Sequence, residues 1–220
     1  MTRALIYKEF RETLPIAGLG LATLLFVAFD AMGYSPAPDL LTSYSSNGIP
    51  FLSDMFVQRY GLAATGLALA LGFWQSLGDF WGDAQLFVLH RPIPRRTIYA
   101  VKLMVGLTTY FVCTLVPLLV YAWWDATPGT HASPFDWSMT AGVWTTWLQT
   151  TALYLGAFLS GLRPAAWLGT RLAPLAAAAL SSVIMVWWES SFWVQMSQVA
   201  IGDAALAAAV LHVSATRDFV

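Results

Sequence analysis

The charged stretch Asp79–Lys102, DFWGDAQLFVLHRPIPRRTIYAVK, separates two long apolar runs, about Phe56–Gly78 and about Ile98–Trp124. It holds two acids, four bases and two prolines, whereas the runs on either side are almost uncharged. Each run exceeds the length of about 20 apolar residues that a helix needs to cross a bilayer. The pattern therefore predicts two membrane-spanning helices joined by a charged, proline-containing connection.

The whole chain of 220 residues has the same character, since 58% of it is hydrophobic and only 10% is charged, with a mean hydropathy of +0.62. A soluble domain is about 25% charged, so a water-soluble globule is excluded. Six spans leave roughly 100 residues in scattered loops, too few for a separate catalytic domain. We predict one all-α transmembrane domain over residues 1–220. Its spans are about Leu14–Met32, Phe56–Gly78, Ile98–Trp124, Ser138–Ser160, Leu172–Trp188 and Trp193–Ala215.

The N-terminal segment Thr2–Glu12 mixes apolar side chains with five charges. Wound as a helix, it has an apolar and a charged flank, which is typical of a helix lying in the membrane interface. We expect Lys8, Glu9 and Arg11 to belong to this interfacial helix, and membrane lipids to be among the partners of the chain. The predicted interfacial helix ends before the first span.

The distribution of bases predicts the orientation. With six spans, ten of the eleven Lys and Arg residues fall on the side of both termini, and only Arg59 falls on the other. Bases in short loops remain on the cytoplasmic side. We therefore expect a multi-pass protein of the plasma (inner) membrane with both termini cytoplasmic. The net charge of −1 gives no sign of nucleic-acid binding.

Motifs for bond chemistry are absent from the sequence. There is no G-x-x-x-x-G-K-[ST] loop and no H-E-x-x-H, and the three histidines are far apart in the sequence. Ser181, Ser182 and His212 have no spacing that joins them into an intramembrane protease site. We expect no catalytic residue, no metal site and no cofactor bound by this chain.

Asp203 is the one ionisable residue predicted deep inside a span. Such acids are costly and face the bundle interior or water. One interpretation is a site on a substrate or proton pathway. The other, which we favour, is a contact between helices in which Asp203 is hydrogen-bonded to Ser, Thr or Gln neighbours.

The connection between the second and third spans resembles the cytoplasmic coupling region of permeases of type-2 ABC exporters. In that family an acid precedes a run of the form F-L-L-H-R-P-x-x-R, and a lysine opens the third span; this chain has Leu86–Arg96 and Lys102. Tyr7–Glu12 resembles the connecting helix of the family, and Arg217-Asp218 its basic–acidic ending. Asp79 stands where a Glu is usual, and Asp83-Ala84 replaces a common Gly-Thr pair.

The resemblance implies a half-transporter whose coupling helix lies within residues 79–97. Its partners would be a cytosolic ABC-type ATPase, which binds ATP and Mg, and a second permease copy or paralogue. Substrate would pass along the permease–permease interface. The residues implied to contact the partner ATPase, or for the arginines lipid headgroups, are Asp79, Asp83, Phe87, His90, Arg91, Pro92, Arg95, Arg96 and Lys102.

Two other functions stay open at this point. The first is a non-transporting scaffold or assembly subunit of a larger membrane complex that keeps the permease fold, since fold does not imply function. The second is a secondary transporter, which needs polar midplane groups in paired positions. Asp203 alone is too little for a secondary transporter.

Overall fold

The structure, a computed structural model, describes residues 2–34, 49–52, 55–78, 94–130, 134–163, 170–187 and 191–216. Within these ranges every regular element is helical, so the all-α class predicted from the sequence is confirmed. The elements are α1 (Thr2–Ala31), α2 (Phe56–Leu77), α4 (Arg95–Ala126), the 3-10 helix η2 (Trp137–Thr140), α5 (Ala141–Leu162), α6 (Ala173–Trp187) and α7 (Phe192–Thr216).

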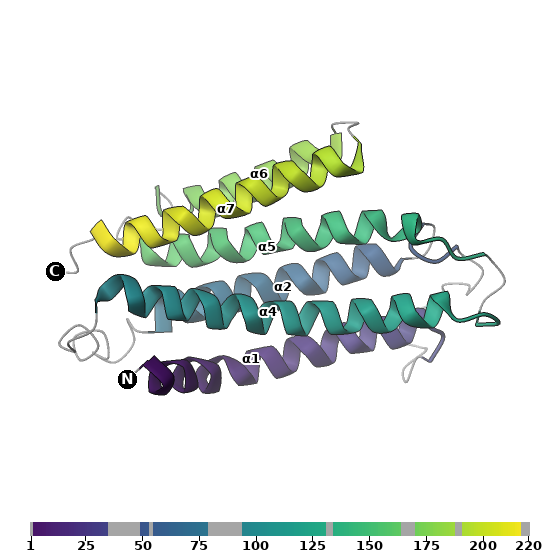
Figure 1. Ribbon diagram of the computed structural model, residues 1–220, viewed down its shortest axis with the longest axis horizontal. Helices are drawn as coiled ribbons and strands as arrows, with labels where there is room; N and C mark the ends of the chain where they lie inside the picture. The colour runs from purple at the N-terminus through teal and green to yellow at the C-terminus, as the bar shows by residue number, and fades with distance from the viewer. Residues whose placement is uncertain are drawn as a thin grey trace.

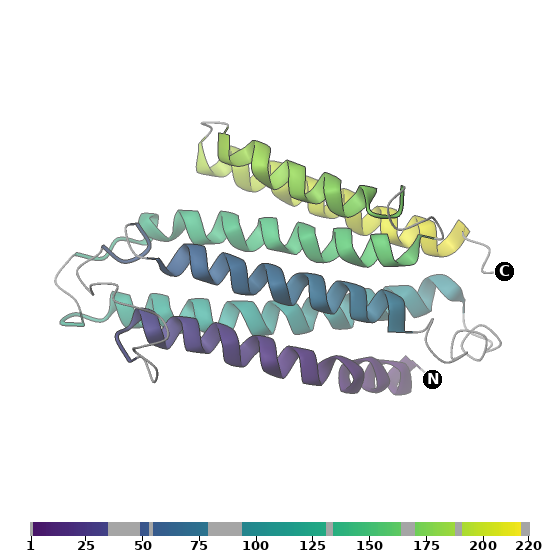
Figure 2. The ribbon, with the colours of Figure 1, turned by 180° about the vertical axis from the view of Figure 1, so that it is seen from behind.

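The helices form an elongated bundle in which successive helices run antiparallel (Figure 1). The start of α1 and the end of α7 therefore lie at the same end, which we call the terminal end. α2 and α5 pack against each other in the middle of the bundle. α1 and α4 cover one side of this pair, and α6 and α7 cover the other (Figures 1 and 2). Because α1 and α4 both start at the terminal end, they run parallel to each other.

The predicted spans coincide with helices, to within a few residues at most ends. Three helical segments are long and apolar enough to cross a membrane: Arg3–Ala31, Arg96–Ala126 and Phe192–Thr216. They belong to α1, α4 and α7, which lie outside the central pair (Figure 1). The central helices α2 and α5 contain several glycine, serine, threonine and glutamine residues, which are typical of contacts between membrane helices.

The structure differs from the prediction of a separate interfacial helix over Thr2–Glu12. α1 continues through this segment into the first span without a break. The Thr13 hydroxyl donates to the carbonyl of Glu9 at 3.0 Å, within the same helix. Glu9, expected in the interfacial helix, is only 1% exposed. The segment packs against the rest of the bundle, where Glu9 forms an ion pair with a buried lysine of α4, as described below.

Glycine allows the central pair to approach closely. A Cβ atom added to Gly72 of α2 would lie 2.7 Å from the carbonyl oxygen of Tyr154 and 2.8 Å from the Cβ of Ala157, both on α5. These distances are below van der Waals contact, so only glycine fits at this crossing. Small residues at helix crossings are a common packing device in membranes.

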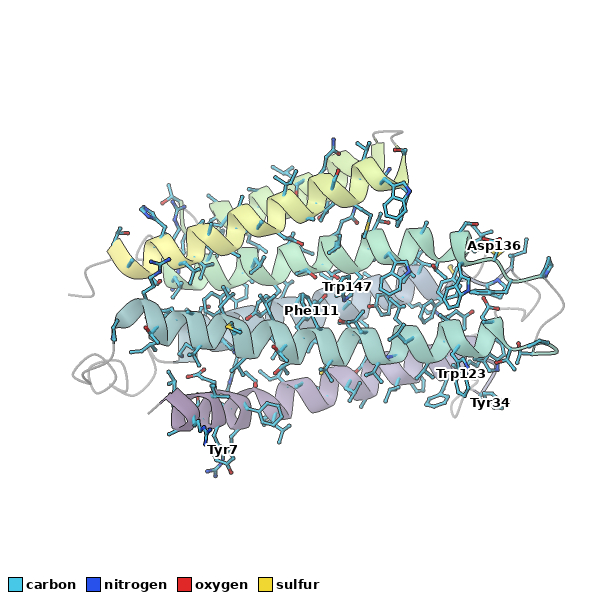
Figure 3. All side chains as sticks on the ribbon, in the orientation of Figure 1. Tyr7, Tyr34, Phe111, Trp123, Asp136 and Trp147 are labelled. Atoms are coloured by element: carbon cyan, nitrogen blue, oxygen red, sulfur yellow. The ribbon has the colours of Figure 1, made fainter. Side chains whose placement is uncertain are left out.

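Aromatic side chains fill the interior and mark the ends of the bundle. In the interior, the rings of Phe111 and Trp147 lie 5.0 Å apart between α4 and α5 (Figure 3). Towards the end opposite the termini, Tyr34 and Trp123 are exposed, Trp123 to 76% (Figure 3). Amphipathic rings at the end of a bundle are typical of the membrane–water interface.

Polar contacts connect the helices at the end of the bundle opposite the termini. Arg59 of α2 forms an ion pair with Asp30 of α1. At the start of η2, the backbone N–H of Ser138 donates to Asp136 at 2.7 Å. Hydrogen bonds from Ser138 to this exposed carboxylate lower the pKa of Asp136. Arg59, the one base predicted on this side, thus has a structural role within the described chain.

Candidate functional site

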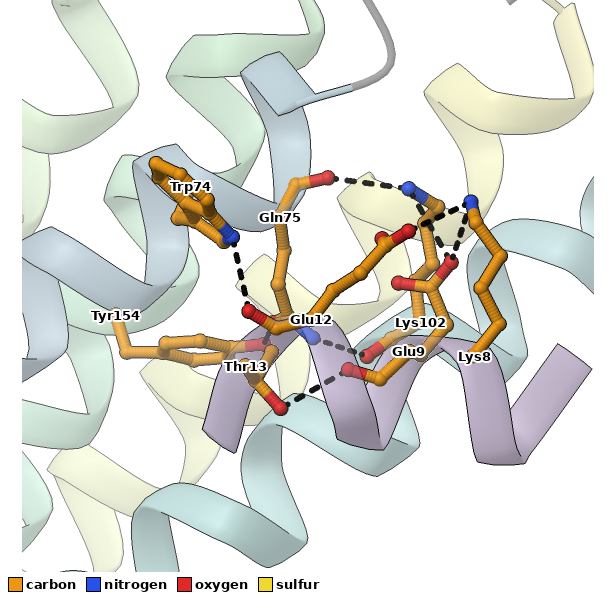
Figure 4. A network of polar contacts seen from close by, with 8 residues as sticks. All are labelled: Lys8, Glu9, Glu12, Thr13, Trp74, Gln75, Lys102 and Tyr154. Carbon is orange, nitrogen blue, oxygen red and sulfur yellow. Dashed lines mark hydrogen bonds and ion pairs between the residues drawn. The ribbon is translucent and has the colours of Figure 1, made fainter. Parts of the chain in front are cut away.

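A cluster of buried polar side chains joins four helices near the terminal end (Figure 4). Its central members are Glu9 of α1, Gln75 of α2, Lys102 of α4 and Tyr154 of α5, and we call these four residues the polar clamp. Glu9, Gln75, Lys102 and Tyr154 are all nearly inaccessible to solvent. Buried polar groups are costly unless they are paired. The contacts within the clamp therefore determine how these four helices fit together.

The charged centre of the clamp is an ion pair between α1 and α4. The Nζ atom of Lys102 lies 3.5 Å from Oε1 of Glu9, and the exposed fractions of the two side chains are 3% and 2%. Lys8 approaches the same oxygen from outside at 3.6 Å and is 39% exposed. The buried Lys102 is thus the main compensation for the charge on Glu9, since an exposed ion pair contributes little.

Gln75 and Lys102 are joined by reciprocal hydrogen bonds between side chain and backbone. The Nζ of Lys102 donates to the carbonyl oxygen of Gln75 at 3.3 Å, and the Nε2 of Gln75 donates to the carbonyl oxygen of Lys102 at 3.2 Å. Gln75 lies in the last turn of α2, where backbone carbonyls lack a partner within the helix. Lys102 therefore satisfies a free carbonyl and places a positive charge at the negative end of the helix dipole.

Tyr154 connects the clamp to α5. Its hydroxyl donates to Oε1 of Gln75 at 2.7 Å, so both ends of the Gln75 amide are used. Gly106 of α4 leaves the necessary space, because a Cβ atom there would collide with Oε1 of Gln75 and with the Tyr154 hydroxyl. The glycine and the two polar side chains form one fitted contact between three helices.

Two further contacts extend the clamp towards solvent. The indole Nε1 of Trp74 donates to the carbonyl oxygen of Glu12 at 3.2 Å, which attaches α2 to α1 (Figure 4). Lys8 also lies 3.5 Å from Oε1 of Glu12, one helical turn further along α1. Polar contacts thus hold the N-terminal turns of α1 to α2 and α4. The contacts made by Lys8 and Trp74 are more exposed to solvent than the ion pair between Glu9 and Lys102.

The clamp lies at both ends of the predicted coupling region. α2 ends at Leu77, two residues after Gln75, and α4 starts at Arg95, seven residues before Lys102. Arg95 opens α4, and Arg96 is exposed. The other predicted coupling residues, namely Asp79, Asp83, Phe87, His90, Arg91 and Pro92, lie outside the described residues.

The structure brings together residues that the sequence analysis assigned to two separate regions. Glu9, predicted in an interfacial helix together with Lys8, pairs with Lys102, predicted at the end of the coupling region. Arg11, predicted beside them, is exposed. Gln75 and Tyr154 were not predicted as site residues. A glutamine in the last turn of an apolar run was a usable signal for Gln75, whereas nothing local distinguishes Tyr154 from an ordinary core tyrosine.

Asp203 lies on α7, which packs against α5 and α4. Both of its carboxylate oxygens are buried, and among the described residues neither has a hydrogen-bond partner. The expected contacts with Ser, Thr or Gln neighbours are therefore not found in the described part of the chain. A buried carboxyl group without a hydrogen-bond partner is costly.

Replacing Asp203 with leucine is expected to raise the free energy of unfolding by about 1–3 kcal/mol, the cost of a buried polar group without a partner. Thermal unfolding of the purified protein in detergent measures the change. Asp203→Asn is the matched variant, and it should stabilise less because its amide stays polar. A loss of stability in Asp203→Leu would contradict the prediction and indicate that the carboxyl group has a bound partner.

A small cavity lies between α5, α6 and α7, with a volume of about 50 Å³. Gln149, Ser181, Ser182 and Gln198 contribute polar atoms to its wall. The hydroxyls of Ser181 and Ser182 both donate to the carbonyl oxygen of Ala178. The volume suits a few water molecules and excludes an organic substrate.

Metal and thiol chemistry give no further site among the described residues. Within those ranges, no three His, Cys, Asp or Glu side chains come close enough together to hold a metal ion. The single cysteine, Cys113, is buried and lies 3.5 Å from the carbonyl oxygen of Ala17. The polar clamp is therefore the candidate functional site. No family model, curated protein or solved structure matches this chain.

Proposed function

We propose that this chain is the permease subunit of an ATP-driven exporter of the type-2 ABC class. The observation that carries the proposal is the position of the polar clamp, which ties together the helices on both sides of residues 79–93, the segment that resembles a coupling region. Three helices with the length and composition of membrane spans support it. So does the concentration of bases near the terminal end, where Lys8, Arg11, Arg96 and Lys102 lie.

The clamp would transmit force from the coupling region to the bundle. A push on residues 79–93 reaches α2 and α4 together, because Gln75 and Lys102 hold the end of one helix to the start of the other. Glu9 passes the movement to α1, and Tyr154 passes it to α5. The four helices would move as one body. Among the described residues, the clamp draws on α1, α2, α4 and α5, so α6 and α7 would move relative to these four helices.

The bond chemistry would belong to a separate subunit. A cytosolic ATPase would bind ATP and Mg and would contact the coupling region, with Arg95 and Arg96 at the start of α4 as its contacts. A second permease subunit would complete the path for the substrate. The residues of this chain would only bind, hold position and move.

Purification of the tagged full chain from its native membranes in mild detergent tests the proposal. Mass spectrometry should identify a co-purifying cytosolic protein with a G-x-x-x-x-G-K-[ST] loop, and the complex should hydrolyse ATP. Arg95→Glu with Arg96→Glu should reduce the bound ATPase by at least about tenfold, the effect of losing two interfacial charge contacts. Arg11→Glu is the control, because Arg11 is exposed on α1.

Two results would count against the proposal. A complex that contains other membrane proteins and no such ATPase would favour the scaffold or assembly subunit. A double variant that retains the ATPase and its activity would show that Arg95 and Arg96 do not contact the ATPase.

A further inference from the structure

An apolar groove of about 480 Å³ runs between α1 and α4 on the outside of the bundle. Ile6, Leu14 and Gly18 line it on α1, and Val101, Met104 and Val112 line it on α4. The lining is open to the surroundings, since Met104 is 69% exposed and Leu14 is 52% exposed. Both helices have the length and composition of membrane spans, so the groove opens towards lipid.

The groove is long enough to hold an acyl chain of one lipid leaflet. Its lining on α1 extends from Ile6 to Leu21, which corresponds to about 22 Å of helix at 1.5 Å per residue. The hydrocarbon core of a bilayer is about 30 Å thick, so one leaflet accounts for about 15 Å of it. The groove starts near the terminal end and stops near the middle of the bundle. A single extended acyl chain of that leaflet fits these dimensions.

The end of the groove nearest the termini is suited to an anion. Arg3 lies one helical turn before Ile6, on the same stripe of α1, and is exposed. Thr97 lies one turn before Val101 on α4 and is also exposed. The N-terminal turn of α4 has positive dipole character at the same level. Arg3, Thr97 and the N-terminal turn of α4 are thus one helical turn beyond the first lining residues, Ile6 and Val101.

We propose that the groove binds one acyl chain of an anionic phospholipid, with Arg3 holding the headgroup phosphate beside the start of α4. Arginine suits this role because its forked donors match the oxygens of a phosphate group. Basic sites between membrane helices near the cytoplasmic surface are a known mode of anionic-lipid binding. The inference depends on the membrane location of α1 and α4 and is independent of the proposed transport function.

Gly18 gives a direct way to fill the groove. It belongs to the lining, and a Cβ atom added there meets nothing within 4 Å. Gly18→Leu therefore occupies the groove without displacing the backbone, and leucine favours the helix more than glycine does. Gly66→Leu on α2 is the matched control, because Gly66 also has open space around it and lies outside the groove. Arg3→Gln removes the headgroup contact, with Arg11→Gln as its control.

Native mass spectrometry of the full chain, titrated with dioleoyl phosphatidylglycerol and dioleoyl phosphatidylcholine, measures the binding. The wild-type chain should bind one phosphatidylglycerol about fivefold more tightly than phosphatidylcholine, the effect expected of one base near an anionic headgroup. Arg3→Gln should abolish this preference while retaining the lipid. Gly18→Leu should reduce the binding of both lipids. Gly66→Leu and Arg11→Gln should bind as the wild type does.

Three outcomes would overturn the proposal. Equal binding of the two lipids by the wild type would remove the headgroup site. Undiminished lipid binding by Gly18→Leu would show that the acyl chain does not lie in the groove. A wild-type dimer that Gly18→Leu converts into a monomer would show that a second protein copy, and not a lipid, occupies the groove. Thermal unfolding of each variant verifies that a loss of binding is not a loss of fold.

Discussion

Replacing Lys102 with methionine is expected to lower the free energy of unfolding by about 3–5 kcal/mol, the cost of breaking a buried ion pair from one side. Methionine fills a similar volume but leaves the carboxylate of Glu9 buried without its main cation. It also leaves the carbonyl of Gln75 without the lysine that caps the last turn of α2. Thermal or denaturant unfolding of the purified protein in detergent measures the loss.

Two further variants separate the buried charge from the other effects of Lys102→Met. Lys8→Met removes the exposed lysine that approaches the same oxygen of Glu9, and it should cost no more than about 1 kcal/mol. Glu9→Gln combined with Lys102→Met removes both charges and should recover a large part of the lost stability. A Lys102→Met variant as stable as Lys8→Met would show that the ion pair does not hold α1 to α4.

Replacing Gly72 with leucine is expected to destabilise the bundle by about 3 kcal/mol, the upper part of the range for overpacking a core. Even the first side-chain atom would collide with the backbone of α5, at the carbonyl oxygen of Tyr154. Backbone atoms cannot rotate away as a side chain can, so α2 and α5 would have to separate. Because these two helices form the centre of the bundle, the loss should appear in global unfolding.

Gly66→Leu on the same helix is the control for this substitution. A Cβ atom at Gly66 meets nothing within 4 Å, so the higher helix propensity of leucine should stabilise the protein by about 0.5–1 kcal/mol. The two substitutions change the same residue type in the same helix and should have opposite signs. If both destabilise equally, the crossing at Gly72 is not the close contact described above.

The helices of the fold could be predicted from the sequence because each one is an uninterrupted apolar run. Charges and turn residues separate these runs, and the resulting ranges agree with α2, α4, α5, α6 and α7 to within a few residues. The continuity of α1 through the N-terminal segment was not predictable in the same way. Charges in the N-terminal segment indicated a surface helix, but the pattern does not reveal that one of them, Glu9, meets a lysine from a distant part of the chain.

The clamp shows that contacts between residues far apart in the chain could not be predicted from local sequence patterns. Lys102 and Glu9 were singled out by local patterns, one in a charged connection and the other in an amphipathic segment. Their partnership spans more than ninety positions and depends on the parallel packing of α1 and α4, which no local pattern specifies. Gln75 and Tyr154 join them only because α2 and α5 approach closely at Gly72. For Asp203, a hydrogen-bond partner of the carboxyl group is not found among the described residues.

The ion pair between Glu9 and Lys102 also has a consequence for biosynthesis. A ribosome completes α1 before it has made Lys102, so Glu9 is synthesised well before its buried partner. During that interval, the adjacent residue Lys8 can pair with Glu9. The contact between α1 and α4 can form only after Lys102 has been made. Nascent chains that end before Lys102 would thus carry α1 without the helix against which Glu9 packs.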